Sequence, residues 1–127
     1  ALTGFRTGEI GNNTDAKIFQ GVIVDEILSL LQAKQISLRD PDIRSTIAAF
    51  SGTIFNKPSM LQHMENGVLT EIDALNGAAV REGRLLGMEL PYNAAITLLV
   101  KATSARSIRS LHGHPTDYET LEAIEKA

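Results

Sequence analysis

The sequence predicts an all-α protein that folds as one domain. Apolar residues recur at spacings of three and four in several segments, which is the pattern of amphipathic helices. No segment alternates apolar and polar residues as a half-buried strand does. A chain of 127 residues can bury one modest core, and no internal repeat divides it.

Composition limits the classes of partner and chemistry. Hydrophobic residues make up 43% and charged residues 21%, as in an ordinary globular protein, and the absence of tryptophan leaves a core of Leu, Ile, Val and Ala. The net charge of -3, without a basic run, argues against a nucleic-acid partner. The absence of cysteine excludes disulfides, thiolate metal sites and a cysteine nucleophile. No apolar stretch approaches the ~20 residues of a membrane span, and the first residues lack the order of a signal peptide.

The first half of the chain predicts a lead-in and two helices. Residues 1–14 are rich in glycine and asparagine and read as turns. Thr14 or Asp15 caps a helix that runs to about Lys34, and Asp40-Pro41 starts the next one, with proline at the first helical position. The residues expected to be buried are Ile18, Phe19, Val22, Ile23, Ile27, Leu30 and Leu31 in the first helix and Ile43, Ile47 and Phe50 in the second.

Residues 58–77, PSMLQHMENGVLTEIDALNG, contain two apparent capping boxes. Ser59 with Gln62 predicts a short helix that ends near Asn66, with Gly67 as the left-handed residue after it. Thr70 with Asp73 predicts a fourth helix that stops near Gly87 and buries Ile72, Leu75, Ala79 and Val80.

The fourth helix would then contain Asn76-Gly77 in its interior. A glycine there costs ~1 kcal/mol relative to alanine, a cost that close approach of another backbone or a ligand would explain. Pro91 opens a fifth helix that reaches about Arg109, with Ile96, Leu99 and Val100 inward. Thr116 with Glu119 predicts a short final helix carrying Tyr118, Leu121 and Ile124.

The segment SMLQHMENGVLTEIDALNG resembles a motif of the ketopantoate reductases (2-dehydropantoate 2-reductases), S-S-M-x-Q-D-x-x-x-G-R-x-T-E-I-D-x-x-N-G. The resemblance continues through LLGMELPYNAAITLLVKA and covers roughly residues 1 to 102. Three positions depart from it: Pro58 replaces serine, His63 replaces aspartate and Val68 replaces arginine. The matching residues are Ser59, Met60, Gln62, Gly67, Thr70, Glu71, Ile72, Asp73, Asn76, Gly77, Gly87, Pro91 and Asn93.

The resemblance implies one helical, substrate-side domain over residues 1–127, of the kind found in ketopantoate reductase and 6-phosphogluconate dehydrogenase-like proteins. In that family an N-terminal Rossmann domain holds NADP, and hydride passes to the ketone of a 2-keto acid in pantothenate synthesis. This sequence has no glycine-rich dinucleotide fingerprint. The family's proton-donating lysine, in a K-x-x-x-N segment, would lie upstream of Ala1. We therefore expect no catalytic residue in this chain and no activity from it alone, with a cytoplasmic location and a homodimer as further expectations.

The resemblance assigns substrate and cofactor positions. Ser59 and Asn56 match residues that face the keto acid, and Thr7 stands where an asparagine of the family binds substrate. From the residues alone, Ser59 is a helix cap whose N-terminus favours an anion. Glu71 matches a glutamate on the nicotinamide-ribose side of the cofactor, near the catalytic lysine, although spacing alone makes it an acid favoured by a helix dipole.

Other polar residues predict less. His112 and His114 lack a third ligand nearby, so no metal site is expected. His63 reads as a surface or packing residue and Lys57 as a solvated loop charge. Two alternatives to the ketopantoate reductase remain: a free-standing helical interaction or dimerisation module without activity, and a reductase of another branched 2-keto acid.

Overall fold

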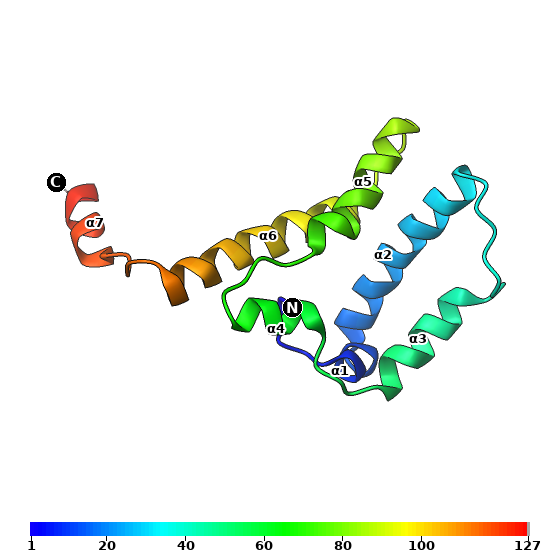
Figure 1. Ribbon diagram of the computed structural model, residues 1–127, viewed down its shortest axis with the longest axis horizontal. Helices are drawn as coiled ribbons and strands as arrows, with labels where there is room; N and C mark the ends of the chain where they lie inside the picture. The colour runs from blue at the N-terminus through cyan, green and yellow to red at the C-terminus, as the bar shows by residue number, and fades with distance from the viewer. Residues whose placement is uncertain (127) are drawn as a thin grey trace.

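The computed structural model describes residues 1–126, and all of the regular elements in that range are helices. Seven α-helices and one 3₁₀ helix follow one another in these residues, which confirms the predicted all-α class (Figure 1). Their bounds are α1 Thr7–Asn12, α2 Thr14–Ala33, α3 Ile43–Thr53, α4 Ser59–Glu65, η1 Ile72–Ala74, α5 Asn76–Leu85, α6 Pro91–His112 and α7 Tyr118–Glu125. None of the helices in the described part of the chain is long and apolar enough to cross a membrane.

The N-terminal lead-in differs from the expectation of turns because it contains α1. The backbone N–H of Arg6 donates to the Glu9 carboxylate at 2.7 Å, which fixes the first turn of this short helix. Gly11 then lets α1 cross α3 closely: a Cβ built on Gly11 would lie 2.4 Å from the backbone of Ser51 and Gly52. Tertiary packing rather than local propensity therefore holds α1.

Two hydrophobic clusters form the core, both against α6. The first joins α2, α5 and α6, and the second joins α4, η1 and α6. The buried members are Leu30, Val80 and Leu90 in the first cluster and Met64, Ile72 and Val100 in the second.

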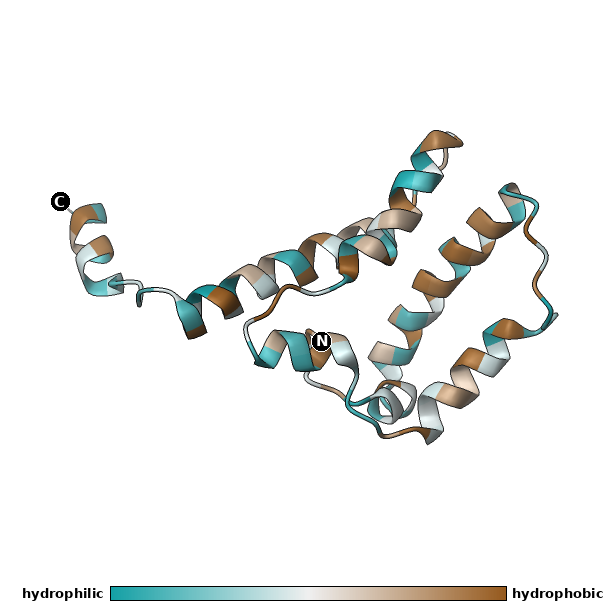
Figure 2. Cartoon of the chain, in the orientation of Figure 1, coloured by the Kyte–Doolittle hydropathy of each residue, from teal (hydrophilic) through white to brown (hydrophobic). Residues whose placement is uncertain are grey.

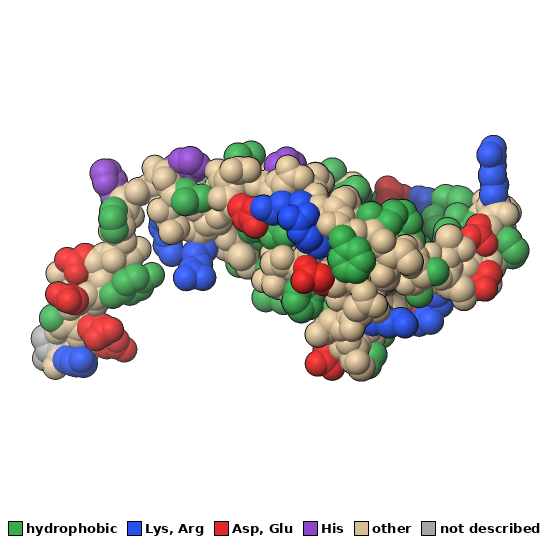
Figure 3. All heavy atoms as spheres, turned by 90° about the horizontal axis from the view of Figure 1, so that it is seen from below, with side chains coloured by type: hydrophobic (Ala, Val, Ile, Leu, Met, Phe, Trp, Pro, Cys, Tyr) green, Lys and Arg blue, Asp and Glu red, His purple; other side chains and the backbone are tan. Residues whose placement is uncertain are grey.

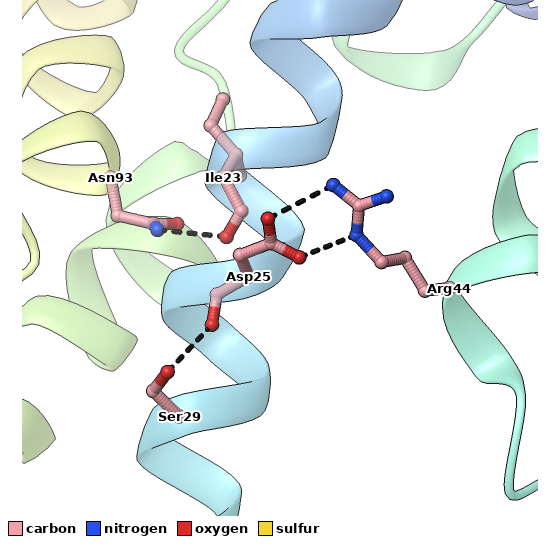
Figure 4. Close-up of polar contacts among 5 residues, drawn as sticks. All are labelled: Ile23, Asp25, Ser29, Arg44 and Asn93. Carbon is pink, nitrogen blue, oxygen red and sulfur yellow. Dashed lines mark hydrogen bonds and ion pairs between the residues drawn. The ribbon is translucent and has the colours of Figure 1, made fainter.

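A buried polar network joins α2, α5 and α6 beside the first cluster. Asn93 is fully buried, and its amide nitrogen donates to Glu26 at 2.7 Å and to the carbonyl of Ile23 at 3.2 Å. Asn76 donates to the amide oxygen of Asn93 at 2.9 Å. Figure 4 shows Asn93 reaching the Ile23 carbonyl and, on the other side of α2, the two-bond pair of Arg44 with Asp25 at 2.5 and 2.9 Å. These contacts set the spacing of α2 from α6 and from α3.

Several predicted helix starts are wrong by a few residues. The helix predicted from Asp40 begins at Ile43, because the Asp40 carboxylate accepts from the Asp42 N–H and the Thr46 hydroxyl in a turn. Asn13 rather than Thr14 caps α2. At the last helix, Asp117 rather than Thr116 is the cap.

The fourth predicted helix is split in two. Residues 72–74 form η1, and the backbone breaks at Leu75 before α5 starts at Asn76. Asn76-Gly77 therefore begins a helix instead of interrupting one. A Cβ on Gly77 would lie 2.8 Å from Asp73 Oδ1 and 3.5 Å from the carbonyl of Ile72, so atoms of the preceding turn approach this glycine closely.

Many residues expected to be buried are exposed. Leu30, Ile72, Val80 and Val100 are buried as predicted. Figure 2 shows where hydrophobic residues occur along the helices, in brown. The α7 helix stands off from the body, with acidic side chains on it (Figure 3), and all of its residues are exposed. Predicted core residues that are exposed include Ile18, Phe50, Leu75, Leu99, Tyr118, Leu121 and Ile124.

Candidate functional site

Ser59 and Glu71 meet in the structure. Ser59 is the first residue of α4, and Glu71 ends the loop between α4 and η1. The Ser59 hydroxyl donates to Glu71 Oε1 at 2.8 Å. Two positions twelve residues apart thus form one polar site at the exposed start of α4.

Neither capping box predicted for this segment forms. Pro58, not Ser59, is the cap residue of α4, and because proline has no side-chain acceptor, no side chain caps this helix. The side-chain amide of Gln62 donates to the carbonyl of Lys57 at 3.0 Å instead of reaching back to Ser59. Asp73 pairs with Lys101 at 2.7 Å instead of reaching back to Thr70.

His63 is the third member of the site, and sequence reasoning missed it. Its Nδ1 lies 2.8 Å from Glu71 Oε2, the oxygen that Ser59 leaves free. Ser59 and His63 are four residues apart on α4, so they share a face of the helix. The four-residue spacing was the signal in the sequence, because any residue that contacts Ser59 on this face of α4 also lies near His63.

The site favours an anionic Glu71. The hydrogen bond from Ser59, a backbone hydrogen bond and then the contact with His63 lower the pKa of Glu71 below its ordinary value. Partial burial opposes this shift but does not cancel it. An ionised carboxylate has about four lone-pair positions. Ser59, His63 and the backbone N–H take three of them, which leaves acceptor capacity for a ligand.

The order of the three groups argues against a serine hydrolase. In a serine triad the imidazole lies between the hydroxyl and the carboxylate and removes the hydroxyl proton. Here the carboxylate of Glu71 lies between Ser59 and His63. The imidazole of the Ser59–Glu71–His63 cluster therefore has no role as base for Ser59.

The other two predicted site residues lie beside one another. The backbone N–H of Thr7 donates to the carbonyl of Asn56 at 3.4 Å, which places the start of α1 next to the loop that leads into α4. Asn56 is exposed and Thr7 is partly buried. Their contact is between backbones, so both side chains stay available for another partner.

The remaining polar candidates have structural roles. Lys57 forms an ion pair with Glu65, so it is not a free loop charge. His112 Nε2 lies 3.1 Å from the carbonyl of Asn66, where it helps join the end of α6 to the turn at Gly67. No group of three metal-ligating side chains is assembled within residues 1–126.

The structure is that of an all-α domain with a partly exposed polar cluster at the start of α4. The chain belongs to the ketopantoate reductase family, because the family model described as "Ketopantoate reductase PanE/ApbA C terminal" matches residues 1–104. This confirms the resemblance found in the sequence. The residues after 104 lie outside the match.

Relatives and solved structures agree with this family. The chain is 34% identical over 107 residues to 2-dehydropantoate 2-reductase of Streptococcus pyogenes and 30% identical over 111 residues to that of Aquifex aeolicus, covering 83% and 80% of this chain. A PanE/ApbA family ketopantoate reductase from Ralstonia eutropha superposes over 84% of this chain with a TM-score of 0.77 and 26% identity. D-mandelate dehydrogenase, solved with NADH and anilino(oxo)acetate, superposes over 81% with a TM-score of 0.69 and 29% identity.

This chain spans only about a third of the length of these proteins. The matched regions are 35% and 34% of the two curated reductases and 36% and 35% of the two solved chains. The family assignment therefore rests on a helical domain that corresponds to about a third of each relative.

Proposed function

We propose that this chain is the substrate-side domain of an NADP-dependent 2-dehydropantoate 2-reductase, which reduces ketopantoate to pantoate in pantothenate biosynthesis. The observation that carries the proposal is the hydrogen bond from Ser59 to Glu71. It brings together the two residues that the family resemblance assigns to substrate and cofactor. Family membership and the names of the relatives support the same reaction.

Reduction of a keto acid requires a hydride, a proton for the developing alkoxide and donors for the substrate carboxylate. The nicotinamide cofactor supplies the hydride when it is bound. We propose that a partner Rossmann domain holds most of that cofactor and carries the lysine that gives the proton. The residues of this chain bind and orient the two ligands.

Glu71 fits hydroxyl groups such as those of the nicotinamide ribose. It is an acceptor with free lone pairs, and its lowered pKa keeps it charged near neutral pH. Its side chain is about one-third exposed, at 34%, so a ligand can reach it. Its charge also favours a nearby ammonium group, because an opposite charge raises the pKa of an amine.

Ser59 fits the keto-acid carboxylate under one condition. Its hydroxyl has a single proton, and in this structure that proton goes to Glu71. For Ser59 to donate to a substrate carboxylate, the proton must turn away from Glu71. A ligand hydroxyl that replaces it at Glu71 would permit this. Asn56 and Thr7 complete the proposed substrate side.

A second candidate is a reductase of another 2-keto acid. The similarity to D-mandelate dehydrogenase favours it, because that neighbour was solved with NADH and a different oxo acid. The replacement of aspartate by His63 and of arginine by Val68 in the family motif also favours a changed ligand pocket.

The test uses the purified natural gene product that contains this chain. NADPH and NADH oxidation would be followed by absorbance with ketopantoate and with other branched or aromatic 2-keto acids. We expect kcat/KM to be highest for ketopantoate with NADPH, by about tenfold or more, since the net value of one hydrogen bond is about that factor. A preference for another acid selects the second candidate, and absence of all reduction rejects both.

A further inference from the structure

His63 and Ser59 hold the two oxygens of one carboxylate from one face of α4. Ser59 bonds Oε1 of Glu71 at 2.8 Å, and His63 bonds Oε2 at 2.8 Å. We infer that His63 is a positioning residue, which fixes the orientation of the Glu71 carboxylate for the ligand hydroxyls that Glu71 binds. Neither the family match nor the names of the relatives assigns this position a role.

The orientation of the Glu71 carboxylate depends on a second side-chain hydrogen bond, because the surrounding structure leaves the side chain partly exposed. The residue lies outside the helices, at the end of the loop before η1, and its side chain is partly exposed. The last torsion of a glutamate side chain is soft, so a carboxylate with one hydrogen bond can rotate about that bond. Two bonds, one to each oxygen, fix the plane of the carboxylate and the directions of its free lone pairs.

The contact requires that Nδ1 carry the proton. An ionised carboxylate only accepts hydrogen bonds, so the ring nitrogen that faces Glu71 must donate. This holds for the neutral imidazole with its proton on Nδ1 and for the imidazolium. His63 therefore keeps its hold on Glu71 in both charge states, and the contact does not depend on which of them is present.

The inference rests on the proposed function for the identity of the ligand, so its experiment has two parts. The first part compares His63→Leu with His63→Asn in the full gene product. The side-chain amide of the introduced asparagine can donate from nearly the position of Nδ1, whereas leucine cannot donate. We expect leucine to raise the KM for NADPH by about tenfold with a smaller change for the keto acid, and asparagine to restore most of the affinity.

The matched control is His112→Leu, because His112 contacts a backbone carbonyl away from Glu71. It should leave both KM values unchanged. The inference is overturned if His63→Leu and His63→Asn behave alike, or if both match the wild type while the wild type is active. Far-ultraviolet circular dichroism of each variant separates loss of folding from loss of positioning.

The second part does not need activity. The pKa of Glu71 is measured by NMR titration of its side-chain carboxyl carbon in the wild type and both variants. Loss of the His63 contact should move this pKa upward toward its ordinary value, and asparagine should reverse part of that change. An unchanged pKa in His63→Leu overturns the hold on Glu71, even if the protein reduces no keto acid. If the wild type is inactive and His63→Leu still shifts the pKa of Glu71, the proposed function is rejected but the positioning of Glu71 by His63 is supported.

Discussion

Glu26 and Asn93 are joined by two hydrogen bonds in the interior. Glu26 Oε2 accepts from both the backbone N–H and the side-chain amide of Asn93, at 2.9 and 2.7 Å. Its other oxygen accepts from the N–H of Tyr92 at 2.9 Å. A carboxylate from α2 thus satisfies the N–H groups of the first turn of α6, at the end of the helix where a negative charge is favoured.

Replacing Asn93 by alanine should lower the free energy of unfolding by about 1–3 kcal/mol, because Glu26, Asn76 and the Ile23 carbonyl each lose a partner in the interior. Urea denaturation measures the change. Asn66→Ala is the control, since its exposed side chain bonds only a carbonyl of its own helix. Equal effects of the two substitutions would contradict a structural role for the buried network.

The close crossing of α1 and α3 predicts a position-specific effect of alanine. Gly11→Ala should cost about 1–3 kcal/mol, since its Cβ would meet the backbone of α3 at 2.4 Å. Gly52→Ala, on the opposite helix, should be tolerated, because its new Cβ would lie 3.8 Å from the nearest atom, Oδ1 of Asn12. Thermal unfolding of both variants tests this, and a harmless Gly11→Ala would show that α1 does not pack as described.

Replacing Ser59 by alanine should raise the KM for the keto acid about tenfold and that for NADPH less, because the hydroxyl is the proposed donor to the substrate carboxylate. Steady-state kinetics of the full gene product measures both constants. Ser29→Ala serves as the control, since Ser29 bonds a carbonyl within α2 away from the site. A similar rise in both constants would count against a role for Ser59 on the substrate side.

Glu71 should contribute to the pH dependence of stability. Its folded pKa is lowered from an ordinary value of 4.5, so folding favours the ionised form. The stabilisation is therefore fully present above pH 4.5 and is lost as pH falls through the lower folded pKa.

The stability difference between the wild type and Glu71→Gln should shrink across that acid range. Urea unfolding at neutral pH and at several pH values below 4.5 measures it. Glu119→Gln on the exposed α7 provides the control, and a difference that stays constant or grows on acidification would contradict the lowered pKa.

The helices themselves were predictable because their signals are local. The first long helix, the short one at Ser59 and the one opened by Pro91 all form near the predicted positions. Gly67 adopts the left-handed conformation expected after α4, with a φ of 61°. Periodicity and glycine stops act over a few residues, so the sequence shows them directly.

The predicted burial was less accurate, because helical spacing marks an apolar face without showing what covers it. The α7 face with Tyr118, Leu121 and Ile124 has the expected pattern and yet lies open. This chain spans about a third of the length of its relatives, and part of its apolar surface is exposed to solvent.

By itself, the sequence determined the all-α class, the approximate helices and, through its motif, the family. Only the tertiary structure decided where the polar side chains bond. Ser59 and Asp73 satisfy the spacing of helix caps, but each bonds a residue far along the chain. The physical reason is competition: a cap is worth about 1 kcal/mol, and a charge-assisted bond to a distant residue is worth as much or more. Such a partner becomes available only when packing brings Glu71 or Lys101 within reach. The spacing of Ser59 and His63 therefore indicates that they share a face of α4, but it does not show that Glu71 contacts both.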